Sequence, residues 1–315
     1  MLNAYIGEVG RLVAADLSAD PTALDRALWL DLIDPNDEEL AQAANLLRQE
    51  LPDPEDVEEI EASSRFYEDE AGLHIHSLFL HEVEGKLRNT SVAFTLTDNR
   101  LITLREREIP AFRLLRMRAR HYPQLVKSPT HMVLSLFEIK IDDLADVLEE
   151  LYRELEVVSA QVLEKSEVDL EESLDALAHC EDTNGKVRLC LMDTQRALTF
   201  LLRRGRLDSE QIVWTRGLLH DIESLLSHNN FVFDKINFLM TAAQGFINIE
   251  QNQIIKIFSI AAVVFLPPTL VASIYGMNFD FMPELHWVWG YPMALGLMLI
   301  SGVAPYWYFK RKGWL

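Results

Sequence analysis

The residues with the most distinctive chemistry form the segment Tyr275-Gly276-Met277-Asn278-Phe279 near the C-terminus. The side chain of Asn278 offers a neutral amide oxygen, and the backbone around it adds carbonyl oxygens. Mg²⁺ prefers oxygen ligands and gives up its water shell reluctantly, so neutral oxygens can bind the hydrated ion. Softer metals would recruit Cys or His, and neither occurs between Lys256 and Glu284. These residue types indicate a site for a hydrated, hard cation.

The helix expected before this segment carries a stripe of polar, small and apolar residues. Stepping back from Asn278 by about one helical turn at a time gives Ser273, Thr269, Leu266, Ala262, Phe258 or Ser259, Ile255 and Asn252. The stripe is polar at both ends and apolar in the middle, which suits a water-filled conduit with an apolar gate. A helix whose small residues simply pack against neighbours would give a similar pattern. The spacing leaves open whether Phe258 or Ser259 faces the conduit.

Two segments without Asp, Glu, Lys, Arg or His, residues 257–279 and 287–309, are long enough to cross a bilayer. The first eighteen residues of the earlier segment would span about 27 Å as a helix, at about 1.5 Å per residue. Aromatic residues lie at both ends of the second segment, where interfacial side chains are expected. A buried hairpin in a soluble protein is the alternative. We predict two membrane helices, at 257–275 and 287–309.

Basic residues predict the orientation of these helices, because Lys256 precedes the first and Lys310-Arg311-Lys312 follows the second. The positive-inside rule then places both termini in the cytoplasm, and the loop 276–286 faces outward. That loop carries Asp280 and Glu284. A ring of such carboxylates would concentrate cations at the mouth, although simple solvation of the loop explains them equally well.

Two helices cannot enclose a pathway, because backbone polar groups in lipid must be satisfied internally and a hairpin has no lumen. A conducting protein must therefore be an oligomer of identical chains, surrounded by membrane lipid, in which each inward side chain forms a ring.

The net charge is −20, and residues 251–315 carry +2, so residues 1–250 carry −22. This excess argues against nucleic acid as a partner. The N-terminus lacks the pattern of a secretory signal, so residues 1–250 are expected in the cytoplasm.

We expect an α+β cytoplasmic domain over residues 1–130, long cytoplasmic helices including a stalk helix over 131–256, and a transmembrane domain over 257–315 with a tail at 310–315. The predicted strands are Gly72–Leu80, Ser91–Thr97 and Arg100–Arg105, and the last two form a hairpin. The predicted shorter helices are Asp37–Leu47, Pro54–Ser63 and Ile109–Arg120. Breaks between the long helices are expected near Glu167–Leu170, Glu181–Gly185 and Gly205–Asp208, and one helix runs from Asp208 into the membrane.

Other residues that could do chemistry give weaker signals. Four acidic runs, which most simply solvate a helix face, are Asp142-Asp143, Glu149-Glu150, Glu167–Asp175 and Glu181-Asp182. His74, His76 and His81 fit an ordinary strand better than a zinc site. Cys180 and Cys190 fit buried thiols. No nucleotide-binding loop, catalytic triad or HExxH motif indicates an enzyme.

The filter-like segment, the following Met282-Pro283-Glu284-Leu285, the second membrane helix and the terminus Lys310-Arg311-Lys312-Gly313-Trp314-Leu315 together resemble the CorA magnesium transporters. These belong to a superfamily of metal ion transporters with a Gly-Met-Asn motif. Stretches such as Glu61-Ala62-Ser63-Ser64-Arg65-Phe66 and 188–196 resemble its enterobacterial-type branch. The resemblance extends along most of the chain.

The resemblance implies a funnel-shaped homopentameric channel in the cell inner membrane, with no cofactor, that mediates influx of Mg²⁺ and also of Co²⁺ or Ni²⁺. It implies that Gly276, Met277 and Asn278 form the selectivity filter, with Asn278 contacting the hydrated ion. Thr269 would form a second polar ring. The hydrophobic gate would consist of Leu266, Phe258 and Ile255. The resemblance also implies that closure responds to cytoplasmic Mg²⁺ bound between subunits. Carboxylates that face each other across subunits repel until a divalent ion bridges them, so the four acidic runs named above are the candidates, and the sequence does not choose among them.

Two alternatives remain open at this point. One is a transporter of zinc or another transition metal from the same superfamily, whose filter would more often depart from Gly-Met-Asn. The other is a membrane-anchored signalling scaffold, which would need only one apolar helix and no polar stripe. The polar stripe favours a conducting protein over the scaffold.

Overall fold

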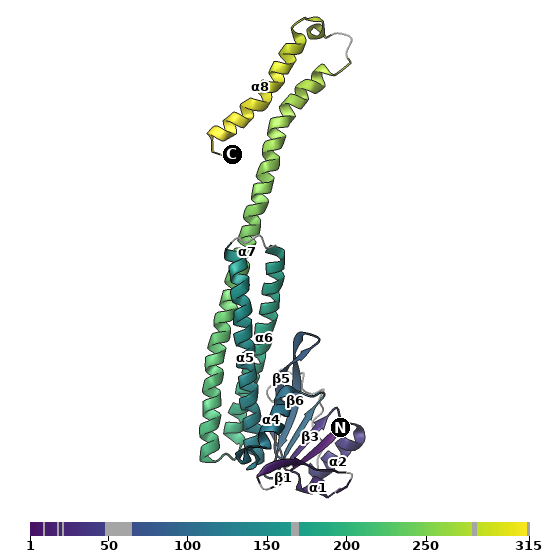
Figure 1. Cartoon of the computed structure of the whole chain (residues 1–315), viewed down its shortest axis with the longest axis vertical. Helices are drawn as coiled ribbons and strands as arrows, with labels where there is room; N and C mark the ends of the chain where they lie inside the picture. Colours follow the sequence, from purple (N-terminus) through teal and green to yellow (C-terminus); the bar gives the residue numbers. More distant parts are fainter. Residues whose placement is uncertain are drawn as a thin grey trace. The chain divides into compact units, whose positions relative to one another are not determined.

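The computed structural model describes residues 1–8, 10–17, 19–20, 22–47, 65–164, 170–278 and 282–313 (Figure 1). The chain divides into two compact units, Met1–Met240 and Thr241–Leu315. The predicted helix Pro54–Ser63 lies outside the described residues. The domain boundaries expected at residues 130 and 256 stay predictions.

Within the described residues of the first unit, seven strands form one mixed sheet in the order β2-β1-β3-β7-β6-β5-β4. The strands are β1 (Leu2–Glu8), β2 (Arg11–Ala14), β3 (Trp29–Ile33), β4 (Phe66–Glu68), β5 (Leu73–Val83), β6 (Lys86–Leu96) and β7 (Leu101–Arg105). Strands β3 and β7 pair in parallel, and the other neighbours pair antiparallel. The predicted hairpin is confirmed as β6–β7. A longer hairpin, β5–β6, turns at Glu84 and Gly85, both with positive φ.

The helices are α1 (Ala23–Arg26), α2 (Asp37–Leu47), α4 (Pro110–Ala119), α5 (Pro129–Leu163), α6 (Leu170–Arg204), α7 (Ser209–Tyr275) and α8 (Gly290–Arg311), with 3₁₀ turns η2 (Pro123–Val126) and η3 (Pro283–His286). Local signals account for the helix starts. Ser128 caps α5 by accepting a hydrogen bond from the His131 backbone N–H, and Pro129 occupies the first turn. Asp208 and Gln211 form a reciprocal capping box before α7.

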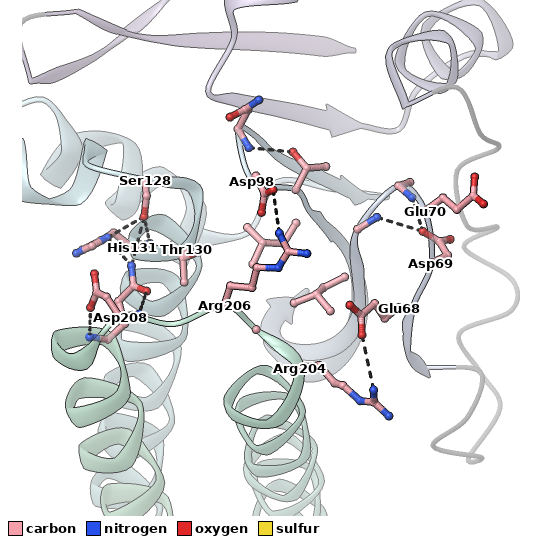
Figure 2. Close-up of a pocket in the computed structure, with 18 of the residues that line it drawn as sticks. Glu68, Asp69, Glu70, Asp98, Ser128, Thr130, His131, Arg204, Arg206 and Asp208 are labelled. Atoms are coloured by element: carbon pink, nitrogen blue, oxygen red, sulfur yellow. Dashed lines mark hydrogen bonds and ion pairs between the residues drawn. The ribbon is translucent and has the colours of Figure 1, made fainter.

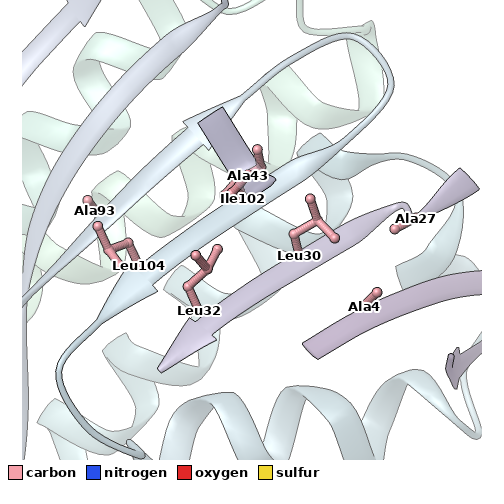
Figure 3. Close-up of a cluster of buried hydrophobic side chains, with 8 residues drawn as sticks. All are labelled: Ala4, Ala27, Leu30, Leu32, Ala43, Ala93, Ile102 and Leu104. Carbon is pink, nitrogen blue, oxygen red and sulfur yellow. The ribbon is translucent and has the colours of Figure 1, made fainter. Parts of the chain in front are cut away.

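Apolar side chains cover both faces of the sheet. On one face, Phe79 and Phe94 of the sheet meet Phe112 of α4 and Phe137 of α5, with ring centroids 5.5–6.3 Å apart. Figure 3 shows a second cluster, which consists of Ala4, Ala27, Leu30, Leu32, Ala43, Ala93, Ile102 and Leu104. Helix α2 contributes Ala43 to this cluster. The expected α+β class is therefore confirmed.

One predicted break is wrong, because α6 runs without interruption through Glu181–Gly185. This stretch contains Thr183, Asn184 and Gly185, which are weak helix formers. Both Thr183 and Asn184 are buried, and Asn184 forms hydrogen bonds with Asn229 of α7. Tertiary packing thus overrides the local preference. The break near Gly205–Asp208 is confirmed by the connection between α6 and α7.

Candidate functional site

The predicted filter residues lie directly after the last turn of α7. The Gly276 backbone N–H donates to the Ala272 carbonyl at 2.9 Å, and the Met277 N–H donates to the Ile274 carbonyl at 3.3 Å. A Cβ atom on Gly276 would lie only 3.0 Å from the Ala272 carbonyl oxygen, so glycine suits this tight turn. The chain leaves the helix at this point, and Met277 and Asn278 are exposed. Their role in ion binding stays a prediction.

Helices α7 and α8 are both long and apolar enough to cross a membrane, by length and composition. In the second unit they lie side by side (Figure 1). One face of α7 is half-buried there, and its residues recur every three or four positions: Ile260, Ala261, Val264, Pro267, Pro268, Val271 and Tyr275. Gly302 of α8 packs on this face, against Val264 and Pro268. This face therefore belongs to the contact between α7 and α8.

The predicted pore-lining residues lie on the opposite face of α7. Asn252, Ile255, Phe258, Ser259, Ala262, Leu266, Thr269 and Ser273 are all exposed in the single chain. The side chains of Phe258, Leu266 and Ile255 are 71%, 65% and 61% exposed. Bulky apolar side chains with this exposure need lipid or other subunits around them. Phe258 and Ser259 are both exposed, so the choice between them stays open.

Thr269, the predicted second polar ring, is already engaged within its own helix. Its hydroxyl donates a hydrogen bond of 2.7 Å to the Phe265 carbonyl oxygen, one turn earlier. The hydroxyl proton is therefore used within the helix, and the oxygen Oγ1 can still accept a hydrogen bond from a water molecule. A hydrated cation presents water hydrogens outward, so this orientation suits it.

The loop after the filter is described only in part. Asp280 lies outside the described residues. Glu284 is exposed within η3, and its carbonyl oxygen accepts a hydrogen bond from the Trp287 N–H at 3.3 Å. A Cβ on Gly290 would lie 2.2 Å from that same carbonyl oxygen, so a glycine is required where α8 begins. The proposed attraction of cations by Glu284 and Asp280 stays a prediction.

The acidic runs differ in their surroundings. Asp143 lines a surface cavity of about 300 Å³ between β5, α4 and α5, together with His81, Glu82 and Asp146. Desolvation, followed by repulsion from Asp146 and Asp142, raises the pKa of Asp143 to about 6. By contrast, other acidic runs already have cationic partners: Glu149 and Glu150 pair with Arg153, and Asp182 pairs with Lys186. The run Glu167–Asp175 is described only from residue 170 onward.

A larger pocket of about 700 Å³ lies in the first unit, at the ends of the sheet hairpins and beside the starts of α5 and α7 (Figure 2). Its charged side chains carry both signs and pair across it, Arg204 with Glu68 at 3.9 Å and Arg206 with Asp98 at 3.4 Å. His131 is held by Ser128 and Gln211. Paired charges of this kind favour no single class of ligand.

The remaining candidate residues have structural surroundings. His74 contacts Asp69 at 3.0 Å and Thr95 at 3.1 Å. Cys180 and Cys190 are free, buried thiols. Across the described ranges, no three His, Cys, Asp or Glu side chains gather into a group that could hold a metal ion within one chain.

Comparison with known proteins gives consistent matches over the whole chain. The chain is 55% identical to the magnesium transport protein CorA of Sodalis glossinidius and 54% identical to that of Escherichia coli strain K12, over 100% of both chains in each case. It shares its fold with the CorA magnesium transporter of Methanocaldococcus jannaschii, with a TM-score of 0.79 at 22% identity, covering 100% of this chain and 99% of the other.

The family model described as "CorA-like Mg2+ transporter protein" matches residues 25–311, which include both candidate membrane helices and the filter segment. The resemblance noted from the sequence is thus confirmed, including its enterobacterial-type character. The match also confirms a membrane transporter rather than an enzyme. By its motif, its fold and its full-length relatives, the chain belongs to the family of CorA-like Mg²⁺ transporter proteins.

Proposed function

We propose that the chain is one subunit of a homopentameric channel that admits Mg²⁺ through a pore lined by α7. The observation that carries this proposal is the division of α7 into two faces. One face contacts α8, and the opposite face bears the polar–apolar–polar stripe that ends at Asn278. In a ring of subunits, the exposed face can line the axis while α8 lies on the lipid side. The relatives named magnesium transport protein CorA support Mg²⁺ as the ion.

In this proposal the hydrated ion meets Gly276, Met277 and Asn278 first. A ring of Asn278 amide oxygens accepts hydrogen bonds from the water shell and leaves the shell intact. Thr269 then offers a second polar ring through its free lone pairs. Beyond it, rings of Leu266, Phe258 and Ile255 close the pathway by excluding water when the channel is shut.

The direction of flux follows the electrochemical gradient. We place the protein in the inner membrane with both termini in the cytoplasm, on the basis of Lys256 and Lys310-Arg311-Lys312 at the helix ends. A negative-inside potential contributes roughly 4.6 kcal/mol per 100 mV for a divalent cation, twice the single-charge value. Influx is therefore the favoured direction.

Closure in response to cytoplasmic Mg²⁺ has its best support at Asp142 and Asp143. Asp143 lines the surface cavity with Asp146, and desolvation, followed by repulsion from Asp146 and Asp142, raises its pKa although Arg118 acts in the opposite direction. A divalent ion bridging this cluster to a neighbouring subunit would relieve the repulsion and hold the two subunits together. The other described acidic pairs already have basic partners, because Glu149 and Glu150 share Arg153 and Asp182 pairs with Lys186.

Flux into proteoliposomes tests the function. We expect Asn278→Ala to abolish Mg²⁺ uptake while the oligomer stays intact, because the amide ring at the entrance is lost. The matched control is Asn230→Ala, which removes an exposed amide from the same helix outside the predicted membrane span. Unchanged uptake in Asn278→Ala, still blocked by cobalt hexaammine, would contradict the proposed filter.

The same assay settles ion preference. Mg²⁺, Co²⁺, Ni²⁺ and Zn²⁺ are supplied side by side at equal concentration. We expect Mg²⁺ to be carried, and Co²⁺ and Ni²⁺ to compete with it, since all three form octahedral hydrated ions. Selective transport of Zn²⁺ would instead favour the transition-metal alternative.

A further inference from the structure

Gly302 of α8 lies against the segment of α7 where two prolines interrupt the helical hydrogen bonds. A Cβ atom at this position would lie 3.2 Å from Cγ of Pro268 and 3.3 Å from the Val264 carbonyl oxygen. Both distances are shorter than ordinary contacts of a Cβ atom. Gly302 is also among the few buried residues of α8. Small residues at such crossings allow two membrane helices to approach closely.

The segment of α7 beneath Gly302 is the most deformable part of that helix by its chemistry. Pro267 and Pro268 have no N–H, so the carbonyls of Val263 and Val264 receive no helical hydrogen bond from them. The next carbonyl, that of Phe265, also accepts the Thr269 hydroxyl. Missing hydrogen bonds and a threonine bonded back to its own helix both promote bending.

This deformable segment lies between two predicted rings of the pore. In the sequence, Leu266 precedes the proline pair and Thr269 follows it. Both point to the face of α7 opposite Gly302. A small displacement of the proline pair by α8 therefore moves Leu266 and Thr269 in the same direction, away from α8.

We propose that Gly302 is a positioning residue that seats α8 on the double-proline segment and so sets how far Leu266 and Thr269 project into the pore. This inference rests on the proposed function, because it assumes that the exposed face of α7 lines the conduit. A side chain at position 302 would push the proline pair toward the axis and narrow the pathway. The entrance at Asn278 would be unaffected.

Helix α8 supplies its own matched control. A Cβ on Gly296 would meet no atom within 4 Å, although both glycines lie in the same helix. Gly296→Ala and Gly302→Ala therefore make the same chemical change with the same effect on helix propensity. They differ only in the contact with α7.

The experiment measures Mg²⁺ uptake by full-length protein in proteoliposomes, as a function of external Mg²⁺, for wild type, Gly296→Ala, Gly302→Ala, Gly302→Val, Pro268→Ala and Pro268→Ala/Gly302→Ala. We expect maximal flux to fall about threefold or more in Gly302→Ala and about tenfold or more in Gly302→Val, because the added atoms have no space at this crossing. The Mg²⁺ concentration at half-maximal flux should not change. Gly296→Ala should match wild type.

The double variant identifies the contact. Pro268→Ala removes the ring atom that a side chain at 302 would meet and returns an N–H to the Val264 carbonyl. Because only the contact with the Val264 carbonyl oxygen remains, we expect flux in Pro268→Ala/Gly302→Ala to lie less than threefold below that of Pro268→Ala alone. General damage to the fold would not be rescued by a second substitution at this one position.

Three outcomes would overturn the inference: equal flux in Gly302→Ala and Gly296→Ala, a changed half-saturating concentration in Gly302→Ala, or a flux in the double variant that is threefold or more below that of Pro268→Ala. If Gly302→Ala does not assemble, the comparison of Pro268→Ala with the double variant decides alone. Absence of Mg²⁺ flux in wild type would instead overturn the proposed function, so the two failures are distinguishable.

Discussion

At the scale of single residues, the first unit depends on charges that are completely buried. The Arg105 guanidinium contacts the Asp31 carboxylate through two bonds, of 2.6 Å from Nη2 and 3.2 Å from Nε, and neither side chain is exposed. Thr103 donates a further hydrogen bond to Asp31, and Arg105 lies over the ring of Phe112. The pair joins β3 to β7, the parallel neighbours of the sheet. Buried charges of this kind are tolerated only as a pair.

Arg105→Met should therefore be strongly destabilising. It leaves the Asp31 carboxylate buried, and the only remaining positive charge paired with it is that of Arg116, at 3.4 Å. We expect a loss of about 3 kcal/mol or more. Asp31→Asn/Arg105→Met should lose less stability, because neither charge is then left buried without its partner.

The control Arg153→Met breaks exposed pairs with Glu149 and Glu150 and should cost about 1 kcal/mol of stability or less. Thermal unfolding of the detergent-solubilised protein measures all three, and equal melting temperatures for both single variants would refute the prediction.

At the scale of secondary-structure elements, a pair of asparagines fixes how α6 and α7 align within the first unit. The Asn229 side-chain amide donates to the backbone carbonyl of Asn184 at 3.0 Å and to its side-chain oxygen at 2.7 Å. The Asn184 amide donates in turn to the Asn229 carbonyl at 3.3 Å. Both side chains are buried. A polar pair in an apolar helix interface specifies one register at a cost in stability, as buried asparagines do in coiled coils.

Replacing one member of this pair should be worse than replacing both. Asn184→Leu leaves the Asn229 amide buried without its side-chain partner and should cost about 1–3 kcal/mol. Asn184→Leu/Asn229→Leu should recover most of that loss but allow the helices to slide, since an apolar interface no longer selects one register. Unfolding measures the first effect, and hydrogen exchange along α6 measures the second. A double variant less stable than the single one would argue against the pairing.

At the scale of the whole molecule, the two units need different surroundings. The first unit buries aromatic and aliphatic side chains on both faces of its sheet. In the second, the large apolar side chains of α7 and α8 are mostly exposed in the single chain. Such a surface is stable only in lipid or against other subunits. In the proposed ring of subunits, the stripe on α7 faces the conduit and the outer face of α8 faces lipid.

The ring arrangement predicts different effects for similar truncations on the two helices. Leu266→Ala, on the predicted gate, should lower the barrier to wetting and raise Mg²⁺ leak about tenfold, equivalent to about 1.4 kcal/mol in the barrier. Ile300→Ala truncates an equally exposed aliphatic side chain on α8 and should leave flux unchanged. Mg²⁺ uptake by the two variants is compared in proteoliposomes loaded with Mg²⁺, the condition that would close the channel under the proposed regulation. Equal effects of the two truncations would place Leu266 outside the pathway.

The sequence by itself determined the features that depend on local pattern. Charge-free runs of sufficient length predicted both membrane helices, strand periodicity predicted β6–β7, and helix signals predicted α2 with its bounds at Asp37 and Leu47. These predictions succeed because propensity and spacing act over a few neighbouring residues. The stepping from Asn278 also placed the predicted pore-lining residues on one face of α7, and their role in a pore stays a prediction.

Only the tertiary structure decided which faces and partners these elements have. The interruption expected at Glu181–Gly185 is absent because Asn184 meets Asn229, 45 residues away. The sequence does not distinguish one acidic run from another, whereas in the structure the run Asp142-Asp143 borders a surface cavity through Asp143. No local signal distinguishes Gly302 from Gly296, yet only Gly302 lies against Pro268. Contacts between residues distant in sequence carry this information, because burial and hydrogen bonding depend on what the fold brings together.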